Sequence, residues 1–136
     1  MFPQNNDRTV PEHILKYAKS QIQEVFSDVS GVNFMMLCTT DGFELHTLYK
    51  KDHYNQGKLA AVTSSLQAMV TALMQELHLQ GCQSITLDAE NGKAIVTAVP
   101  YPSHPMIILT LAEKDVLLGQ VLYMLKTASN AIQDFS

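Results

Sequence analysis

Residues 31–47 read GVNFMMLCTTDGFELHT and carry the clearest structural signal in this chain. The run from Val32 to Thr39 is short and almost continuously apolar, which is typical of a strand buried on both faces. Asp41-Gly42 then supplies the turn residues of a β-hairpin. From Phe43 to Tyr49 apolar residues alternate with polar ones, so we predict a half-buried strand at a sheet edge.

A second group of strands follows later in the chain. Cys82 to Asp88 alternates in polarity, Lys93 to Val99 follows the hairpin signal Asn91-Gly92, and Met106 to Ala112 is again apolar on both faces. Strands that are apolar on both faces belong in the centre of a sheet, and hairpin partners lie next to each other. We therefore predict a central five-stranded antiparallel sheet in the order 2-1-5-4-3.

Three amphipathic segments predict helices that cover the two faces of this sheet. They run from Pro11, from Gly57 to Leu79, and from about Asp115 to Gln133. We expect the middle helix to pack on the sheet through one apolar stripe: Leu59, Val62, Leu66, Met69, Leu73 and Leu77. The predicted fold class is α/β (α+β), with the order α-β-β-α-β-β-β-α. Residues 11–136 would form a single domain after a flexible lead of residues 1–10.

Composition narrows the range of functions. The net charge of −4 and the scattered lysines argue against binding to nucleic acid, which needs a basic face. The sequence has no signal peptide and no apolar run of about 18 residues, so we expect a cytoplasmic protein without membrane insertion.

Cys38 and Cys82 both lie in apolar, strand-like runs, which favours reduced, buried thiols. Charged residues make up only 16%, against about 25% in typical domains, so part of the surface is expected to be covered.

The middle helix is the unusual element. Between Gly57 and Leu77 its only charged residues are Lys58 and Glu76, one near each end. A helix with one side in water normally carries charge on that side. The run 82–88 is also an unprotected edge strand, without lysine or proline to block pairing. A solvent-exposed Ser/Thr/Gln-rich helix face is the alternative, but we predict a homodimer interface at these residues: Ala61, Ser65, Ala68, Met69, Ala72, Met74, Ser84, Thr86 and Asp88.

Motifs of catalysis and cofactor binding are absent from the sequence. It has no phosphate-binding glycine loop, no hydrolase nucleophile elbow and no C-x-x-C pair, and no two histidines have the helical spacing of a metal site. Cys38 with His46 is the one pair worth considering as a nucleophile, but its apolar surroundings favour an inert thiol. We therefore predict no catalytic residues, no cofactor and no metal, in a protein that is not an enzyme.

Taken in order, these motifs resemble the Roadblock/dynein-light-chain family, including its bacterial GTPase-regulator branch. The resemblance covers about residues 11–133. It rests on the opening GVNFMMLCTTDGFELHT, the helix LAAVTSSLQAMVTAL, the hairpin NGKAIVTAV and the ending MIILTLAEKDVLLGQVLYML. It implies dimerisation through the middle helix and the third strand. It also implies a regulator or scaffold of a Ras-like small GTPase, or an adaptor in a motor or signalling assembly.

Two other classes of function remain open at this stage. PAS-like and profilin-like sensor modules share the layout of a helix-flanked antiparallel sheet. A sensor needs a cavity lined by convergent polar groups, whereas the central strands here offer mostly Met, Ile and Leu, with Asn33 as the main polar exception. The third class of function that remains open is an enzyme.

Overall fold

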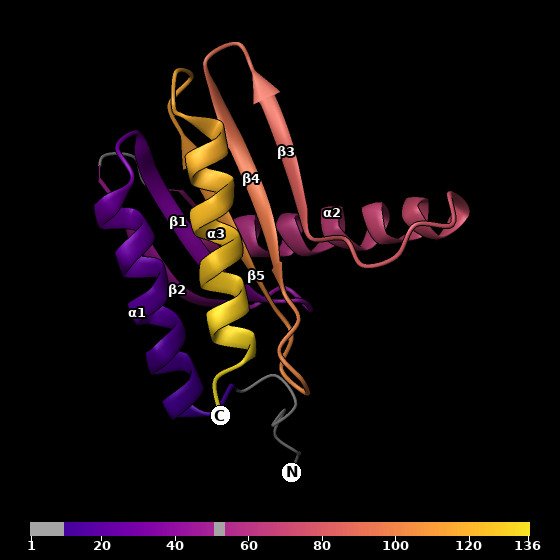
Figure 1. Cartoon of the computed structure of the whole chain (residues 1–136). Coiled ribbons are helices and arrows are strands. Elements are labelled where there is room, and N and C mark those ends of the chain that lie inside the picture. Colours follow the sequence, from indigo (N-terminus) through magenta and orange to yellow (C-terminus); the bar gives the residue numbers. More distant parts are fainter. Residues whose placement is uncertain (1–9, 51–53) are drawn as a thin grey trace.

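The five strands form one antiparallel sheet in the order β2-β1-β5-β4-β3, as the sequence predicts. This computed structural model describes residues 10–50 and 54–136 (Figure 1). The elements are α1 (Glu12–Asp28), β1 (Val32–Thr39), β2 (Glu44–Tyr49), α2 (Gln56–Glu76), β3 (Ser84–Ala89), β4 (Gly92–Val99), β5 (Met106–Ala112) and α3 (Leu118–Gln133).

The predicted Asp-Gly hairpin joins β1 to β2. The Thr39 hydroxyl donates a hydrogen bond to the Asp41 carboxylate and accepts one from the Phe43 N–H at 3.0 Å. Gly42 has a φ of +96°, and a Cβ added there would lie 3.4 Å from the Cα of Ala61. The left-handed backbone therefore favours glycine at this position, and the turn lies in contact with α2.

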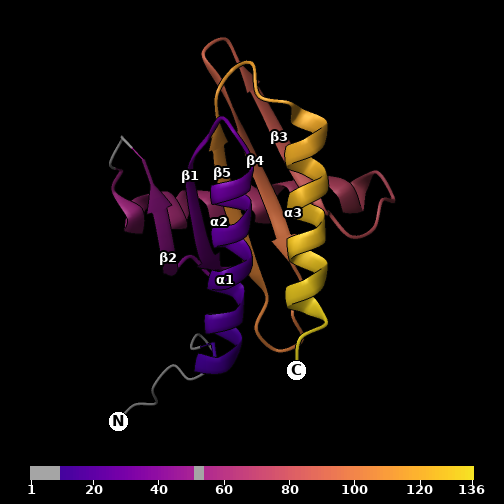
Figure 2. The same ribbon diagram turned by 60° about the vertical axis from the view of Figure 1, so that its left-hand side comes forward.

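The sheet separates two apolar layers. α1 and α3 lie side by side on one face, where the larger core packs around residues such as Ile22, Leu37 and Leu125 (Figures 1 and 2). α2 alone lies on the other face, over a smaller core that includes Phe34 and Val96. Because α2 runs across the strands and not along them, it covers only a belt of its face of the sheet.

The position of α3 is fixed at its C-terminal end. The Ser129 hydroxyl donates to the backbone oxygen of Ala98 at 2.7 Å, which ties the helix to the end of β4. The Tyr101 hydroxyl donates to the backbone oxygen of Phe135 at 2.9 Å, and the Phe135 ring stacks on Tyr17 of α1 at 4.1 Å. The proline-rich loop after β4 thereby holds the end of the chain against α1.

Four sequence-based expectations need correction. α3 begins at Leu118, three residues after the predicted start, and α2 ends at Glu76, before the predicted Leu79. Cys82 precedes β3 and is partly exposed, whereas Cys38 is buried as predicted. Of the predicted flexible lead, residues 1–9 lie outside the described residues, and Val10 is buried against the core.

Candidate protein-binding surface

Only part of the apolar stripe of α2 faces the sheet. The helix buries Ala60 and Thr63 against the strands. Its large apolar side chains are instead exposed, with 55% of Val62, 64% of Met69, 57% of Leu73 and 56% of Leu77 accessible. The prediction that this stripe packs on the sheet is therefore wrong for these four residues. At 3.6 residues per turn, Val62 and Met69 lie roughly 100° or more around the helix from Ala60 and Thr63. Leu73 and Leu77 share the side of Leu66 and Leu59, and they are exposed because this part of α2 extends beyond the sheet (Figure 1).

The N-terminal half of α2 is well anchored, which fixes this orientation. The side chain of Asn55 caps the helix by accepting a hydrogen bond from the Lys58 N–H at 3.0 Å. The Ser64 hydroxyl donates to the backbone oxygen of Thr40 in the β1–β2 turn. Leu59 and Leu66 reach the core of the sheet and are partly buried. These contacts hold the helix in one rotation about its axis.

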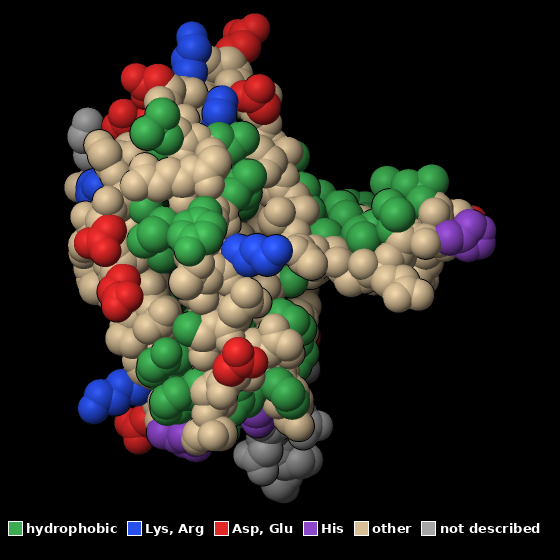
Figure 3. Space-filling view, in the orientation of Figure 1, with side chains coloured by type: hydrophobic (Ala, Val, Ile, Leu, Met, Phe, Trp, Pro, Cys, Tyr) green, Lys and Arg blue, Asp and Glu red, His purple; other side chains and the backbone are tan. Residues whose placement is uncertain are grey.

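The C-terminal half of α2 projects past β3 into the solvent (Figure 1). Figure 3 shows hydrophobic side chains gathered along this projecting arm, with a histidine near its tip. No described helix other than α2 leaves the body of the molecule in this way. Large apolar side chains on such an arm indicate an interaction site, because monomeric proteins rarely expose a large contiguous apolar patch.

The residues predicted from the sequence lie on the same two elements. Met74 is partly buried. The other eight are exposed: Ala61, Ser65, Ala68, Met69, Ala72, Ser84, Thr86 and Asp88. On α2, the small residues border the exposed apolar stripe, so the two together form one uncharged surface. The sequence analysis missed Val62, Leu73 and Leu77 as surface residues. Their regular spacing shows that they share a face, but not whether that face meets the sheet or a partner.

β3 lies at the edge of the sheet beside this arm. It pairs with β4 on one side, from Ser84 opposite Thr97 to Ala89 opposite Gly92, and its other side is open. Asp88 forms an ion pair with Lys93 at 2.9 Å on β4, close to the hairpin turn. Leu87 on this strand is 48% exposed. The open edge and the apolar arm therefore form adjoining parts of one candidate surface.

The possible Cys38–His46 nucleophile pair is not assembled. Cys38 lies opposite Glu44, while His46 lies opposite the neighbouring Leu37, so their side chains point to opposite faces of the sheet. Burial, and then the Glu44 charge, raise the pKa of the Cys38 thiol to about 12. Burial and the nearby Lys19 lower the pKa of His46, against the effect of Glu44. A thiol that stays protonated has little nucleophilic character.

Metal and membrane sites were also sought in the described part of the chain. Residues 10–50 and 54–136 contain no group of three or more His, Cys, Asp or Glu side chains placed to hold a metal ion. Within the same residues, no helix combines the length and the apolar character needed to cross a bilayer.

The fold is that of Roadblock/LC7 domains, as the sequence motifs suggest. The structure superposes on a Roadblock/LC7 domain from Streptomyces avermitilis with a TM-score of 0.71 and 12% identity, over 82% of this chain and 90% of that one. The match to two MglB structures is more extensive. For the gliding protein MglB from Thermus thermophilus, the TM-score is 0.80 and the identity 17%, over 98% of this chain and 96% of that one.

Myxococcus xanthus MglB also gives a TM-score of 0.80, at 14% identity, over 92% of this chain and 91% of that one. These TM-scores establish a shared fold. No family model matches the sequence, and no curated protein matches it either.

Proposed function

We propose that this chain is a non-catalytic, cytoplasmic protein-binding module that forms a homodimer and regulates or scaffolds a Ras-like small GTPase. The observation that carries the proposal is the exposed apolar stripe of α2, formed by Val62, Met69, Leu73 and Leu77. The GTPase class follows from the resemblance to the Roadblock family and agrees with the MglB-like fold.

A homodimer would cover both the exposed stripe of α2 and the free edge of β3. Burying a large apolar side chain stabilises an interface by about 1.5–3 kcal/mol relative to leaving it in water. Four such side chains on one helix therefore offer a substantial gain, and the small residues Ser65, Ala68 and Ala72 allow a second helix to approach closely. An edge strand pairs with its own copy across a two-fold axis without any further complementarity. We place the dimer contact on α2 and on the free edge of β3.

A second surface for the GTPase lies beside α2 on the same face of the sheet. α2 leaves the ends of the strands uncovered there, and a hollow of about 430 Å³ opens between Tyr54, Leu87 and Leu111. Tyr54 meets the buried Phe34 edge-on at 5.0 Å and is itself 42% exposed. The sequence has no phosphate-binding loop. In this proposal the nucleotide is therefore bound by the partner GTPase and not by this chain.

Binding to purified Ras-like GTPases of the source organism tests the proposal directly. Each GTPase would be loaded with GDP or with a non-hydrolysable GTP analogue and titrated against this protein by calorimetry. We expect one GTPase to bind, with a preference between the two nucleotide states. Leu87→Asp should weaken binding by about tenfold or more, because it replaces a large apolar contact in the hollow by a charge.

Lys114→Glu is the control for this experiment. Lys114 is exposed in the segment between β5 and α3, outside the residues that line the hollow. It should leave the affinity within about twofold of the unmodified protein. If none of the Ras-like GTPases binds in either nucleotide state, the GTPase part of the proposal is wrong, whatever the oligomeric state.

A further inference from the structure

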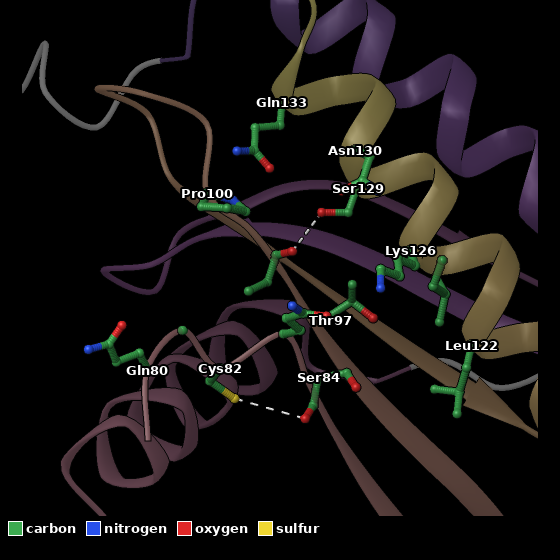
Figure 4. Close-up of a pocket in the computed structure, with 14 residues that line it drawn as sticks. Gln80, Cys82, Ser84, Thr97, Pro100, Leu122, Lys126, Ser129, Asn130 and Gln133 are labelled. Carbon is green, nitrogen blue, oxygen red and sulfur yellow. Dashed lines mark hydrogen bonds between the residues drawn. The ribbon is translucent and has the colours of Figure 1, made fainter. Parts of the chain in front are cut away.

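A groove lies between α3 and β3, on the face of the sheet opposite to α2 (Figure 4). Its volume is about 430 Å³. One wall is the side of α3 from Leu122 to Gln133, the floor includes Thr97 of β4, and the far side is formed by residues 80–84. The sensor alternative required a cavity of this kind, but the groove lies between surface elements and not within the sheet core.

The groove arises because the two helices on this face do not cover all five strands of the sheet. Packed helices lie about 8–10 Å apart, and neighbouring strands about 4.8 Å apart, so two helices cover about four strands. α1 contacts β1 and β2, and α3 contacts β4. The fifth strand, β3, is left bare on this side, and its Ser84 and Thr86 side chains are exposed.

The lining combines an apolar strip with one positive charge. Leu122 and Pro100 supply apolar surface, and Asn130 and Gln133 supply amide groups. Of the residues that line the groove, Lys126 alone is charged, and its ammonium group extends from α3 on the groove side (Figure 4). The groove is therefore positive within a protein whose net charge is −4.

A buried hydroxyl in the floor has no hydrogen-bond partner. Thr97 is only 4% exposed, and its Oγ1 is unpaired in the structure. The neighbouring Ser129 differs, since its hydroxyl donates to the backbone oxygen of Ala98. A buried polar atom normally finds a partner. The Thr97 hydroxyl is therefore an unsatisfied polar group directly beneath the groove.

We propose that this groove binds an amphipathic helix of a partner protein, with an acidic residue of that helix paired to Lys126. Apolar side chains of the partner helix would pack on Leu122 and Pro100, above Thr97. From Leu122 to Gln133 the wall spans eleven steps of 1.5 Å, or about 16 Å, which matches three turns of a helix. A compact metabolite would leave much of that length unfilled.

The floor favours a helix over an extended peptide. β4 is hydrogen-bonded to β3 on one side and to β5 on the other, so the Thr97 backbone is already paired. An extended segment would leave its own backbone groups without partners in the groove, whereas a helix satisfies them internally. This site goes beyond the proposed GTPase function and does not depend on it, because it lies on the other face of the sheet.

A peptide-display selection tests the site with a defined probe. The library would present random 16-residue peptides to the purified full-length protein, and the selected peptides would be synthesised. We expect sequences with apolar residues at three- and four-residue spacing and at least one Asp or Glu, which become helical when bound. Lys126→Glu and the groove-filling Asn130→Trp should each weaken their binding about tenfold or more. Lys114→Glu, with the same change of charge away from the groove, should not.

A charge exchange keeps the test independent of any general damage to the protein. Replacing the acidic residue of a selected peptide by Lys should abolish binding to the unmodified protein and restore it to the Lys126→Glu variant. The proposal is overturned if the selection yields no binder, or yields basic or extended peptides. Binders that are insensitive to both groove variants would equally overturn it.

Discussion

At Gly42 one residue links the β1–β2 hairpin to the orientation of α2. Its φ of +96° strains any residue that has a side chain, and a Cβ added there would contact the Cα of Ala61 at 3.4 Å. The Ser64 hydroxyl bonds to the same turn. The β1–β2 turn therefore supports the first half of α2. The direction of the projecting arm depends on this contact.

Gly42→Ala should lower the free energy of unfolding by about 1–2 kcal/mol, because an L-residue resists the left-handed backbone. Gly119→Ala is the matched control. Gly119 lies in α3, and a Cβ added there meets nothing within 4 Å, so the change should be neutral or stabilising by about 0.5 kcal/mol. Chemical denaturation measures both. Equal effects of the two substitutions would show that the Gly42 conformation is not a constraint.

The two cysteines should differ sharply in reactivity. With a pKa of about 12, Cys38 has roughly one part in ten thousand of its thiol ionised at pH 8. Cys82 is partly exposed before β3. We expect iodoacetamide to modify Cys82 alone in the folded protein, and both residues in denaturant, as read by mass spectrometry. Similar rates for both thiols in the folded state would contradict the burial of Cys38.

At the scale of an element, α2 explains most of what is unusual in the composition. Its outer surface combines the apolar stripe with small uncharged residues, and it carries charge only near its ends, at Lys58 and Glu76. A helix of this kind is costly to leave in water. The uncharged surface is what we expect of a helix that a partner covers.

Met69→Glu should weaken self-association about a hundredfold or more without unfolding the single chain. Met69 is 64% exposed, so Glu is tolerated there in the monomer, but in the proposed interface it would be a buried, unpaired charge. Gln75→Glu adds the same charge on a different side of the helix and should have little effect. Sedimentation and circular dichroism separate the two outcomes. Equal dissociation by both variants would point to a general charge effect.

Ala68→Glu and Ser65→Glu extend the same test to the small residues that the sequence singled out. Both side chains are exposed on α2. Each substitution should disrupt the dimer more than the fold, because it introduces a carboxylate where a second helix approaches. If Met69→Glu dissociates the dimer and these two do not, the contact uses the apolar stripe and leaves the small residues at its margin.

The sequence predicts the sheet well, because strand patterns of period two report burial directly. The apolar runs Val32–Thr39 and Met106–Ala112 could only be central strands, and they are. The rotation of α2 and its extension past the sheet could not be predicted in the same way. The stripe through Met69 and Leu73 indicates a buried face, but a protein partner buries it as well as a sheet does. The groove beside α3 was missed because its walls come from segments far apart in the chain.

At the scale of the whole molecule, a single chain leaves the β3 edge of the sheet open, α2 half uncovered and β3 without a helix over the face opposite to α2. Pairing at β3 would extend the sheet to both copies and bring the two α2 arms into reach of each other. The same pairing would set the two α3 grooves side by side on the opposite face. The dimer would thus offer two distinct faces, one centred on α2 and one between the α3 helices.

Sedimentation equilibrium of the purified protein at micromolar concentration tests the dimer most directly. We predict a mass of about twice the 15.1 kDa of one chain, falling toward the single-chain mass on dilution or in the Met69→Glu variant. A mass of 15.1 kDa at every concentration up to the solubility limit would contradict the central claim that the exposed face of α2 is covered by a second copy of the chain.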